Sequence, residues 1–149
     1  MSRTTSIRVA TEADADAIHG IAETLGFANT SLPTDLDVEQ VTSWIKRLRD
    51  QGQMLVALDG SIPIAFGSLD FSTTEPDIGI LGVWVMPGHQ RRGLATELAD
   101  DLIAFARDHG YRRIRGRLPD SNEAALSFLS SIGAMVPLRN PDMSFELPL

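Results

Sequence analysis

The sequence contains no cysteine in its 149 residues. This absence excludes disulfide bonds, thiolate metal sites and a cysteine nucleophile. A chain without disulfides fits the reducing cytosol, so we expect a cytoplasmic protein. The three histidines do not form a spaced set with carboxylates, so we expect no metal.

Long apolar runs are also missing from the chain. No stretch approaches the roughly 20 apolar residues of a membrane-spanning helix, and residues 1–6 lack the apolar core of a signal peptide. The formal net charge of −7 gives no overall attraction for phosphate backbones. We therefore expect a soluble protein whose partners include neither a membrane nor a nucleic acid.

The length suits one domain, which we expect to span residues 1–149. Hydrophobic periodicity divides it into strands and helices. Predicted strands cover about 7–9, 54–58, 62–71, 78–85, 113–118, 134–136 and 143–147, and predicted helices cover about 12–25, 37–51, 93–109 and 121–132. Strands joined partly by hairpins and partly by helical crossovers indicate a mixed sheet in an α+β or α/β domain.

Local signals fix several of these boundaries. Thr11 and Asp14 have the spacing of a capping box, in which the acid bonds back to the start of the helix. Asp59-Gly60 is a strong hairpin-turn signal. Gly67 inside a strand predicts a bulge, and Gly110 stands where a helix commonly ends in a left-handed residue.

The most informative segment is a strand, a short basic loop and a helix in succession. Residues 78–85 are almost wholly apolar, as expected for a strand buried on both faces. Gly93 then begins a long amphipathic helix. The first turn of a helix offers unpaired N–H groups and the positive end of its dipole, which suits pyrophosphate. Gly93 and the small Ala95 would let phosphate oxygens approach the backbone. The alternative is an ordinary surface turn that carries two arginines.

This segment resembles the pyrophosphate loop of the GNAT superfamily of N-acyltransferases. The match is carried by Gln90-Arg91-Arg92-Gly93-Leu94-Ala95, by the preceding Val83-Trp84-Val85-Met86-Pro87, and by Asn122 to Ala134, which is similar to the family's asparagine helix. The resemblance implies a mixed, mostly antiparallel sheet of about six or seven strands, flanked by four helices. It also implies that the fourth and fifth strands part to admit the cofactor.

The resemblance further implies acetyl-CoA as the cosubstrate and assigns its contacts. Backbone groups of Val83 and Val85 would pair with the pantetheine arm like an added strand. Asn122 would contact the coenzyme or order the parted strands. The pyrophosphate would be held by the loop and the first helical turn, which comprise Gln90, Arg91, Arg92, Gly93, Leu94, Ala95 and Thr96.

The family's usual general acid is missing at its expected position. Relatives often carry a tyrosine seven residues after the helix asparagine, and here that position is Leu129. The only tyrosine, Tyr111, precedes the fifth strand and is in the wrong place. Coenzyme A thiolate leaves readily, so acid catalysis is either dispensable or mediated by water. Ser127, Ser130 or Ser131 could order such a water, although an ordinary helix position is the favoured interpretation for each.

The general base is left open among three carboxylates. The position of the family's glutamate corresponds to Gly79. Asp77 is the first candidate, because it lies two residues earlier on the same predicted strand face. Glu75 in the preceding turn is the second, and Asp70 on the neighbouring strand is an outside candidate. The alternative for each is a solvated acid without a catalytic role.

Acceptor contacts are predicted from location alone. Phe27, Asn29 and Ser31 lie in the loop between the first two helices, which in this family borders the acceptor site. Trp84 either lines the acceptor channel or packs against the helices, and packing is the favoured interpretation. Trp44 is expected to pack within its helix face.

These features predict an acetyl-CoA-dependent N-acetyltransferase that acts on a primary amine by direct attack in a ternary complex. The acceptor would be a small molecule or a peptide, and exposed strand edges would allow a homodimer. A non-catalytic acyl-CoA-binding or regulatory domain is the alternative, because the tyrosine is missing and the base is uncertain. Transfer to a hydroxyl group, or of a longer acyl chain, is not excluded.

Overall fold

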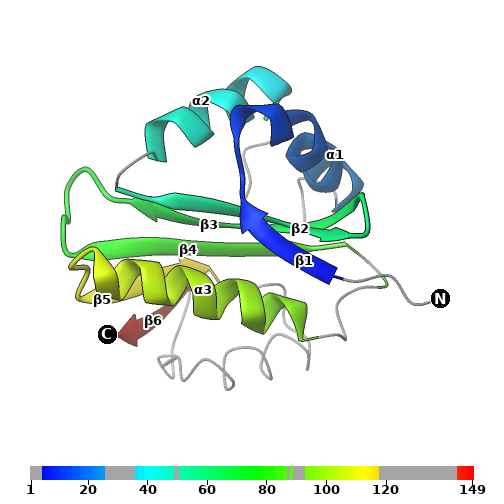
Figure 1. Ribbon diagram of the computed structural model, residues 1–149. Helices are drawn as coiled ribbons and strands as arrows, with labels where there is room; N and C mark the ends of the chain where they lie inside the picture. The colour runs from blue at the N-terminus through cyan, green and yellow to red at the C-terminus, as the bar shows by residue number, and fades with distance from the viewer. Residues whose placement is uncertain (1–4, 26–35, 49–50, 87, 89–92, 118–143) are drawn as a thin grey trace.

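The computed structural model describes residues 5–25, 36–48, 51–86, 88, 93–117 and 144–149. Its elements form a sheet of six strands in the order β1-β2-β3-β4-β5-β6, with α1 and α2 over one face and α3 over the other (Figure 1). The strands are β1 (Thr5–Val9), β2 (Gln53–Asp59), β3 (Ile62–Phe71), β4 (Ile78–Val85), β5 (Arg113–Arg117) and β6 (Ser144–Pro148), and the helices are the 3₁₀ turn η1 (Glu12–Asp14), α1 (Ala15–Leu25), α2 (Val38–Leu48) and α3 (Leu94–Asp108).

The sheet is mixed and mostly antiparallel, as expected. Among the described strands, β4 and β5 are the one parallel pair, because α3 carries the chain from one end of the sheet back to the other between them. Among the described residues the structure has six strands and three α-helices. The expected strand at 134–136 and the expected helix at 121–132 lie outside the described residues.

The predicted helix starts are confirmed by their capping bonds. The Asp14 carboxylate accepts the backbone N–H of Thr11 at 2.8 Å, although a 3₁₀ turn precedes α1 there. Arg8 adds two hydrogen bonds to the same carboxylate, at 2.6 and 2.7 Å. At α2, Asp37 and Gln40 exchange backbone-to-side-chain bonds of 2.8 and 2.9 Å. Each pair satisfies amides that the first helical turn leaves open.

The hairpin turn was predicted correctly, but the bulge at Gly67 was wrong. Asp59 pairs with Ile62 across the turn, where Gly60 has a φ of 64°. The register runs without a break through Gly67, and the irregularity lies between Ala57 and Leu58 instead. Glycine at 67 serves packing, because an added Cβ would lie 3.0 Å from Cδ1 of Leu102 on α3.

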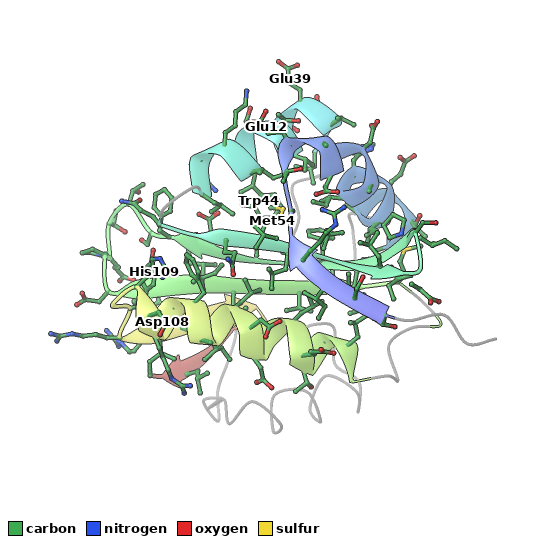
Figure 2. All side chains as sticks on the ribbon, in the orientation of Figure 1. Glu12, Glu39, Trp44, Met54, Asp108 and His109 are labelled. Carbon is green, nitrogen blue, oxygen red and sulfur yellow. The ribbon has the colours of Figure 1, made fainter. Side chains whose placement is uncertain are left out.

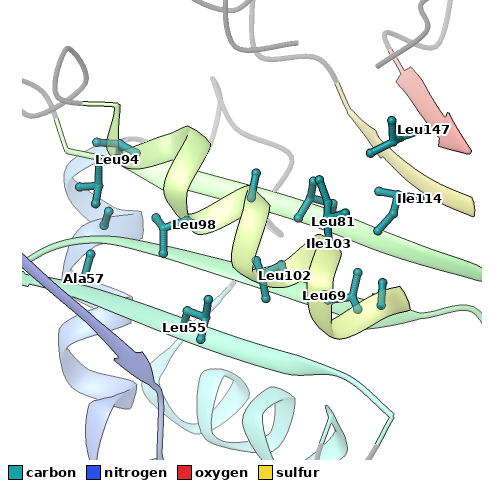
Figure 3. Close-up of a cluster of buried hydrophobic side chains, with 14 of the residues drawn as sticks. Leu55, Ala57, Leu69, Leu81, Leu94, Leu98, Leu102, Ile103, Ile114 and Leu147 are labelled. Carbon is teal, nitrogen blue, oxygen red and sulfur yellow. The ribbon is translucent and has the colours of Figure 1, made fainter. Parts of the chain in front are cut away.

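Each face of the sheet buries its own hydrophobic core. Figure 3 shows the side chains of α3, with Leu94, Leu98 and Leu102 at helical spacing, directed onto the sheet. On the other face, α1 and α2 pack over Val56 and Phe66. The sheet is therefore covered on both sides along β2 and β3. The expectation that residues 78–85 are buried on both faces is only partly correct, because Ile80 is exposed and residues 82–84 are half-buried, whereas Ile78, Leu81 and Val85 are buried.

Candidate active site

The fourth and fifth strands part in the middle of the sheet. Their parallel ladder contains three pairs and ends at Ile80 and Arg115. Nevertheless β4 continues to Val85, and β5 continues to Arg117 in pairing with β6. The strands therefore diverge beyond Ile80, in agreement with the parting that the sequence predicts. We call this region of divergence the fork.

The N-terminus of α3 follows the open end of the fork. Gly93 precedes the helix with φ 68° and ψ 11°, a left-handed conformation that favours glycine. The first helical bond runs from the N–H of Glu97 to the carbonyl of Gly93, at 3.1 Å. The amides of the first turn precede this bond, so they face out of the helix end, where an anion is stabilised.

Among the described residues, none crowds this helix end. A Cβ built on Gly93 would meet no described atom within 4 Å, so backbone conformation, not crowding by the protein, requires the glycine. Leu94 is anchored in the core at 2% exposure, which fixes the position of the first turn. Ala95 and Thr96 are half-buried beside it. These residues are the described members of the set that the sequence resemblance predicts to hold the pyrophosphate.

Val83 and Val85 lie on β4 beyond the end of its ladder with β5. Their side chains pack against the α3 core, with Val85 buried and Val83 half-buried. The other predicted cofactor and acceptor residues lie outside the described residues. These are Phe27, Asn29, Ser31, Gln90, Arg91, Arg92 and Asn122, together with the acid position Leu129.

The two first candidates for the base lie at the closed end of the fork. Glu75 forms an ion pair of 2.9 Å with Arg115, the last residue of β5 that pairs with β4. Asp77 is exposed and immediately precedes β4. Its backbone carbonyl accepts the N–H groups of Arg112 and Arg113 at 2.9 and 3.3 Å. No hydrogen bond to the Asp77 carboxylate occurs within the described part of the chain.

Asp70 is held by three donors and ties α2 to the sheet. One carboxylate oxygen accepts the indole N–H of Trp44 at 3.1 Å and a hydrogen bond from Arg47, and the other accepts the backbone N–H of Phe71 at 2.8 Å. This engagement suits a structural carboxylate better than a base. No sequence pattern indicates this role, because Trp44 and Arg47 lie more than 20 residues from Asp70 along the chain.

Trp84 belongs to an aromatic cluster on the face of the sheet toward α1 and α2. Its ring stacks on Phe66 with centroids 4.7 Å apart, and Trp44 contacts both rings edge-on at 6.1 and 6.5 Å. Figure 2 shows Trp44 between α2 and the sheet. The favoured interpretation of both tryptophans as packing residues agrees with these contacts, and Trp84 is nevertheless half-buried.

Tyr111 lies away from the open end of the fork. Its hydroxyl donates to the backbone carbonyl of Gln51 at 2.6 Å. Burial, and then the negative charge of Asp70, raise the pKa of this phenol above its ordinary value. A hydroxyl already engaged before the start of β5 is poorly placed as the acid, as the sequence indicated.

The described residues contain no group of three or more histidine and acidic side chains that could hold a metal ion. No helix among them is long and apolar enough to cross a membrane.

Comparison with solved structures places the fold among acetyltransferases. A GNAT-family acetyltransferase from Streptococcus pneumoniae is 18% identical, with a TM-score of 0.82 over 98% of this chain and 100% of that one. The yncA protein of Salmonella typhimurium, solved with its cofactor acetyl-CoA, is 21% identical, with a TM-score of 0.82 over 97% and 94%. A ribosomal-protein-alanine N-acetyltransferase from Brucella melitensis is 23% identical, with a TM-score of 0.78 over 97% and 99%.

A search of the curated proteins found no match. The model of the acetyltransferase (GNAT) family, in contrast, matches residues 17–134, which is well over half of the chain and includes β4, the loop after it and α3. Together with the fork and the left-handed Gly93 at the head of α3, this match identifies the chain as a member of the GNAT family of acetyltransferases.

Proposed function

We propose that this protein is an acetyl-CoA-dependent N-acetyltransferase that transfers the acetyl group to a primary amine by direct attack in a ternary complex. The observation that carries the proposal is the β4–β5 ladder, which ends after three pairs next to a helix N-terminus with open space around Gly93. Family membership and the acetyl-CoA bound to the yncA protein, which shares the fold, also support it.

The chain's own residues would hold the cosubstrate at two places. First-turn amides of α3, with the loop from Gln90 to Arg92, would bind the pyrophosphate. The backbone of β4 at Val83 and Val85 would pair with the pantetheine arm within the fork. Acetyl-CoA supplies a thioester carbonyl carbon, to which the amine nitrogen bonds while the carbon–sulfur bond breaks.

A base must take a proton from the acceptor ammonium before attack. We propose Asp77 first, because its carboxylate is exposed and Glu75, the second candidate, is already paired with Arg115. Three residues separate Asp77 from the ladder end, roughly 10 Å along a strand, so it would act through ordered water. The amine loses two protons in all, and one of them can neutralise the departing thiolate.

The acceptor class is a small molecule or peptide with a primary amine, and Phe27, Asn29, Ser31 and Trp84 are the proposed contacts. The alternative function is a non-catalytic acyl-CoA-binding domain. Its support is Leu129, which occupies the position of the family's usual tyrosine acid. Incubation with acetyl-CoA and a broad panel of amines, with detection of free thiol, separates the two. Thiol release that depends on one amine supports the enzyme, whereas tight binding without release across the panel supports the alternative.

Substitution of two glycines, one at each end of α3, tests the proposed cofactor site. Gly93 and Gly110 both have positive φ, 68° and 83°, and both have open space for a side chain. Gly93→Glu and Gly110→Glu therefore impose similar backbone strain. Only Gly93→Glu places a carboxylate at the proposed pyrophosphate cradle, so it should weaken acetyl-CoA binding by at least about 100-fold, equivalent to about 2.7 kcal/mol.

Isothermal titration of each folded variant with acetyl-CoA measures this difference. Circular dichroism and the melting temperature should show similar losses for the two variants. Equal acetyl-CoA affinities of the two variants would contradict the assignment of the α3 N-terminus as the pyrophosphate site.

A further inference from the structure

The cofactor arm of the proposed function would pass beneath the ring of Trp84. An arm that runs along β4 from the head of α3 toward the ladder end passes Val85 and Val83 first. It then reaches Gly82, two residues before the last paired residue, Ile80. The thioester end of such an arm lies within this last stretch of β4, between Gly82 and Ile80.

One face of this stretch is filled by an indole. Gly82 and Trp84 share a sheet face because strand residues alternate. A Cβ built on Gly82 would lie 2.2, 2.7 and 2.9 Å from Cη2, Cζ3 and Cζ2 of Trp84. The far edge of the ring therefore lies directly over Gly82 and occupies the space that a side chain there would take.

The ring is held in this position from two directions. Phe66, the cross-strand partner of Trp84, stacks on it at an interplanar angle of 20° and is fully buried. Trp44 contacts it edge-on from α2, and the indole N–H of Trp44 is bonded to Asp70. Because core side chains pack at high density, displacing Trp84 would require its neighbours to move as well.

The face opens again beyond the ring. Ile80 is 41% exposed, which is unusual for a central strand, and it stands opposite Asp70 in the register. The ring edge thus covers Gly82, and the exposed Ile80 follows it along the strand. Together they would form a short apolar surface at the thioester end of the pantetheine arm. An acetyl methyl group fits beside such a surface, whereas a longer chain directed along this face would meet the indole.

We propose that Trp84 is a specificity-determining residue that limits the acyl group to acetyl by blocking the space over Gly82. This inference rests on the proposed function, because it assumes that the arm lies along β4. One methylene more or less changes discrimination by an apolar site by about tenfold or more. Hexanoyl-CoA should consequently bind the wild-type protein at least about tenfold more weakly than acetyl-CoA.

The test measures the affinities of acetyl-CoA, butyryl-CoA and hexanoyl-CoA for wild-type protein and for Trp84→Leu by isothermal titration. We expect Trp84→Leu to raise the ratio of hexanoyl-CoA to acetyl-CoA affinity by about tenfold or more. Trp84→Phe, which retains a ring to stack on Phe66, should raise the ratio in the same direction by less. It keeps the test decisive if Trp84→Leu does not fold.

Trp44→Leu is the matched control, because it removes an indole from the same cluster whose atoms are not among those nearest to Gly82. It should lower the melting temperature and change the affinity ratio less than Trp84→Leu does, because Phe66 still stacks on the Trp84 ring. An unchanged ratio in folded Trp84 variants, or equal binding of all three thioesters to the wild-type protein, would overturn the inference alone. Failure of the wild-type protein to bind acetyl-CoA would overturn the proposed function, and this inference with it.

Discussion

At the scale of single residues, the carboxylates near the start of β4 differ in what already holds them. Asp70 accepts three hydrogen bonds, Glu75 is paired with Arg115, and Asp77 is exposed. A carboxylate whose oxygens already accept hydrogen bonds from the protein is less free to contact an acceptor amine or a water molecule beside it. From their sequence positions, all three were candidates for the general base. Their contacts in the structure favour Asp77, whose carboxylate is exposed.

Asp77→Asn is therefore expected to slow transfer to the acceptor amine found in the panel by about 100-fold or more at neutral pH. The loss should shrink as the pH rises, because the acceptor amine then deprotonates without help. The pH dependence of kcat/KM measures both effects.

Asp70→Asn is the control for this experiment. It should lower the free energy of unfolding by about 1–3 kcal/mol, the range for hydrogen bonds to a charged group, while the transfer rate of the folded protein stays within a few-fold. Loss of transfer in Asp70→Asn with normal rates in Asp77→Asn would exchange their roles.

At the scale of elements, sequence patterns predicted what is decided locally. The ends of β3, the capping bonds of Asp14 and Asp37 and the turn at Gly60 all depend on residues within a few positions of one another. Parting of β4 from β5 and the role of Gly93 came from the resemblance to a family. The Asp70 network and the ring of Trp84 over Gly82 depend on strand register and helix placement, which periodicity does not encode.

Gly67 lies on β3, but the need for glycine there comes from the packing of α3 on β3 and not from the strand alone. Gly67→Ala would place its methyl group 3.0 Å from Cδ1 of Leu102 and 3.3 Å from the carbonyl oxygen of Gly82. Overpacking of this kind costs about 1–3 kcal/mol. Urea denaturation should show this loss of stability.

The double variant Gly67→Ala/Leu102→Val should be less destabilised than the sum of its single variants, because valine lacks the Cδ1 atom that the new methyl group meets. Strict additivity of the two changes would mean that glycine at 67 does not serve the packing of α3 on β3.

At the scale of the whole molecule, the sheet separates two helical layers, and a buried acid lies where the sheet meets one of them. The net charge is −7, yet Asp14 is only 7% exposed. Its carboxylate joins β1 to the start of α1, because it accepts both guanidinium bonds of Arg8 and the N–H of Thr11. The ionisation of this one acid therefore affects how firmly β1 is joined to the start of α1.

Acid should therefore destabilise the fold partly through Asp14. Hydrogen bonds from Arg8 lower the pKa of this carboxyl below its ordinary value of 3.8, against the opposing effect of burial. A depressed folded-state pKa gives stability that is fully present above the unfolded pKa and is lost as the pH falls through the folded pKa. The stability difference between wild type and Asp14→Asn should accordingly be constant from neutral pH down to about pH 5 and should shrink below about pH 4.

Urea unfolding across this pH range measures the stability difference. The control is Asp16→Asn, which alters an exposed acid of α1 and should follow the wild-type profile. A stability difference that does not change with pH would show that the ionised form of Asp14 does not stabilise the junction of β1 and α1.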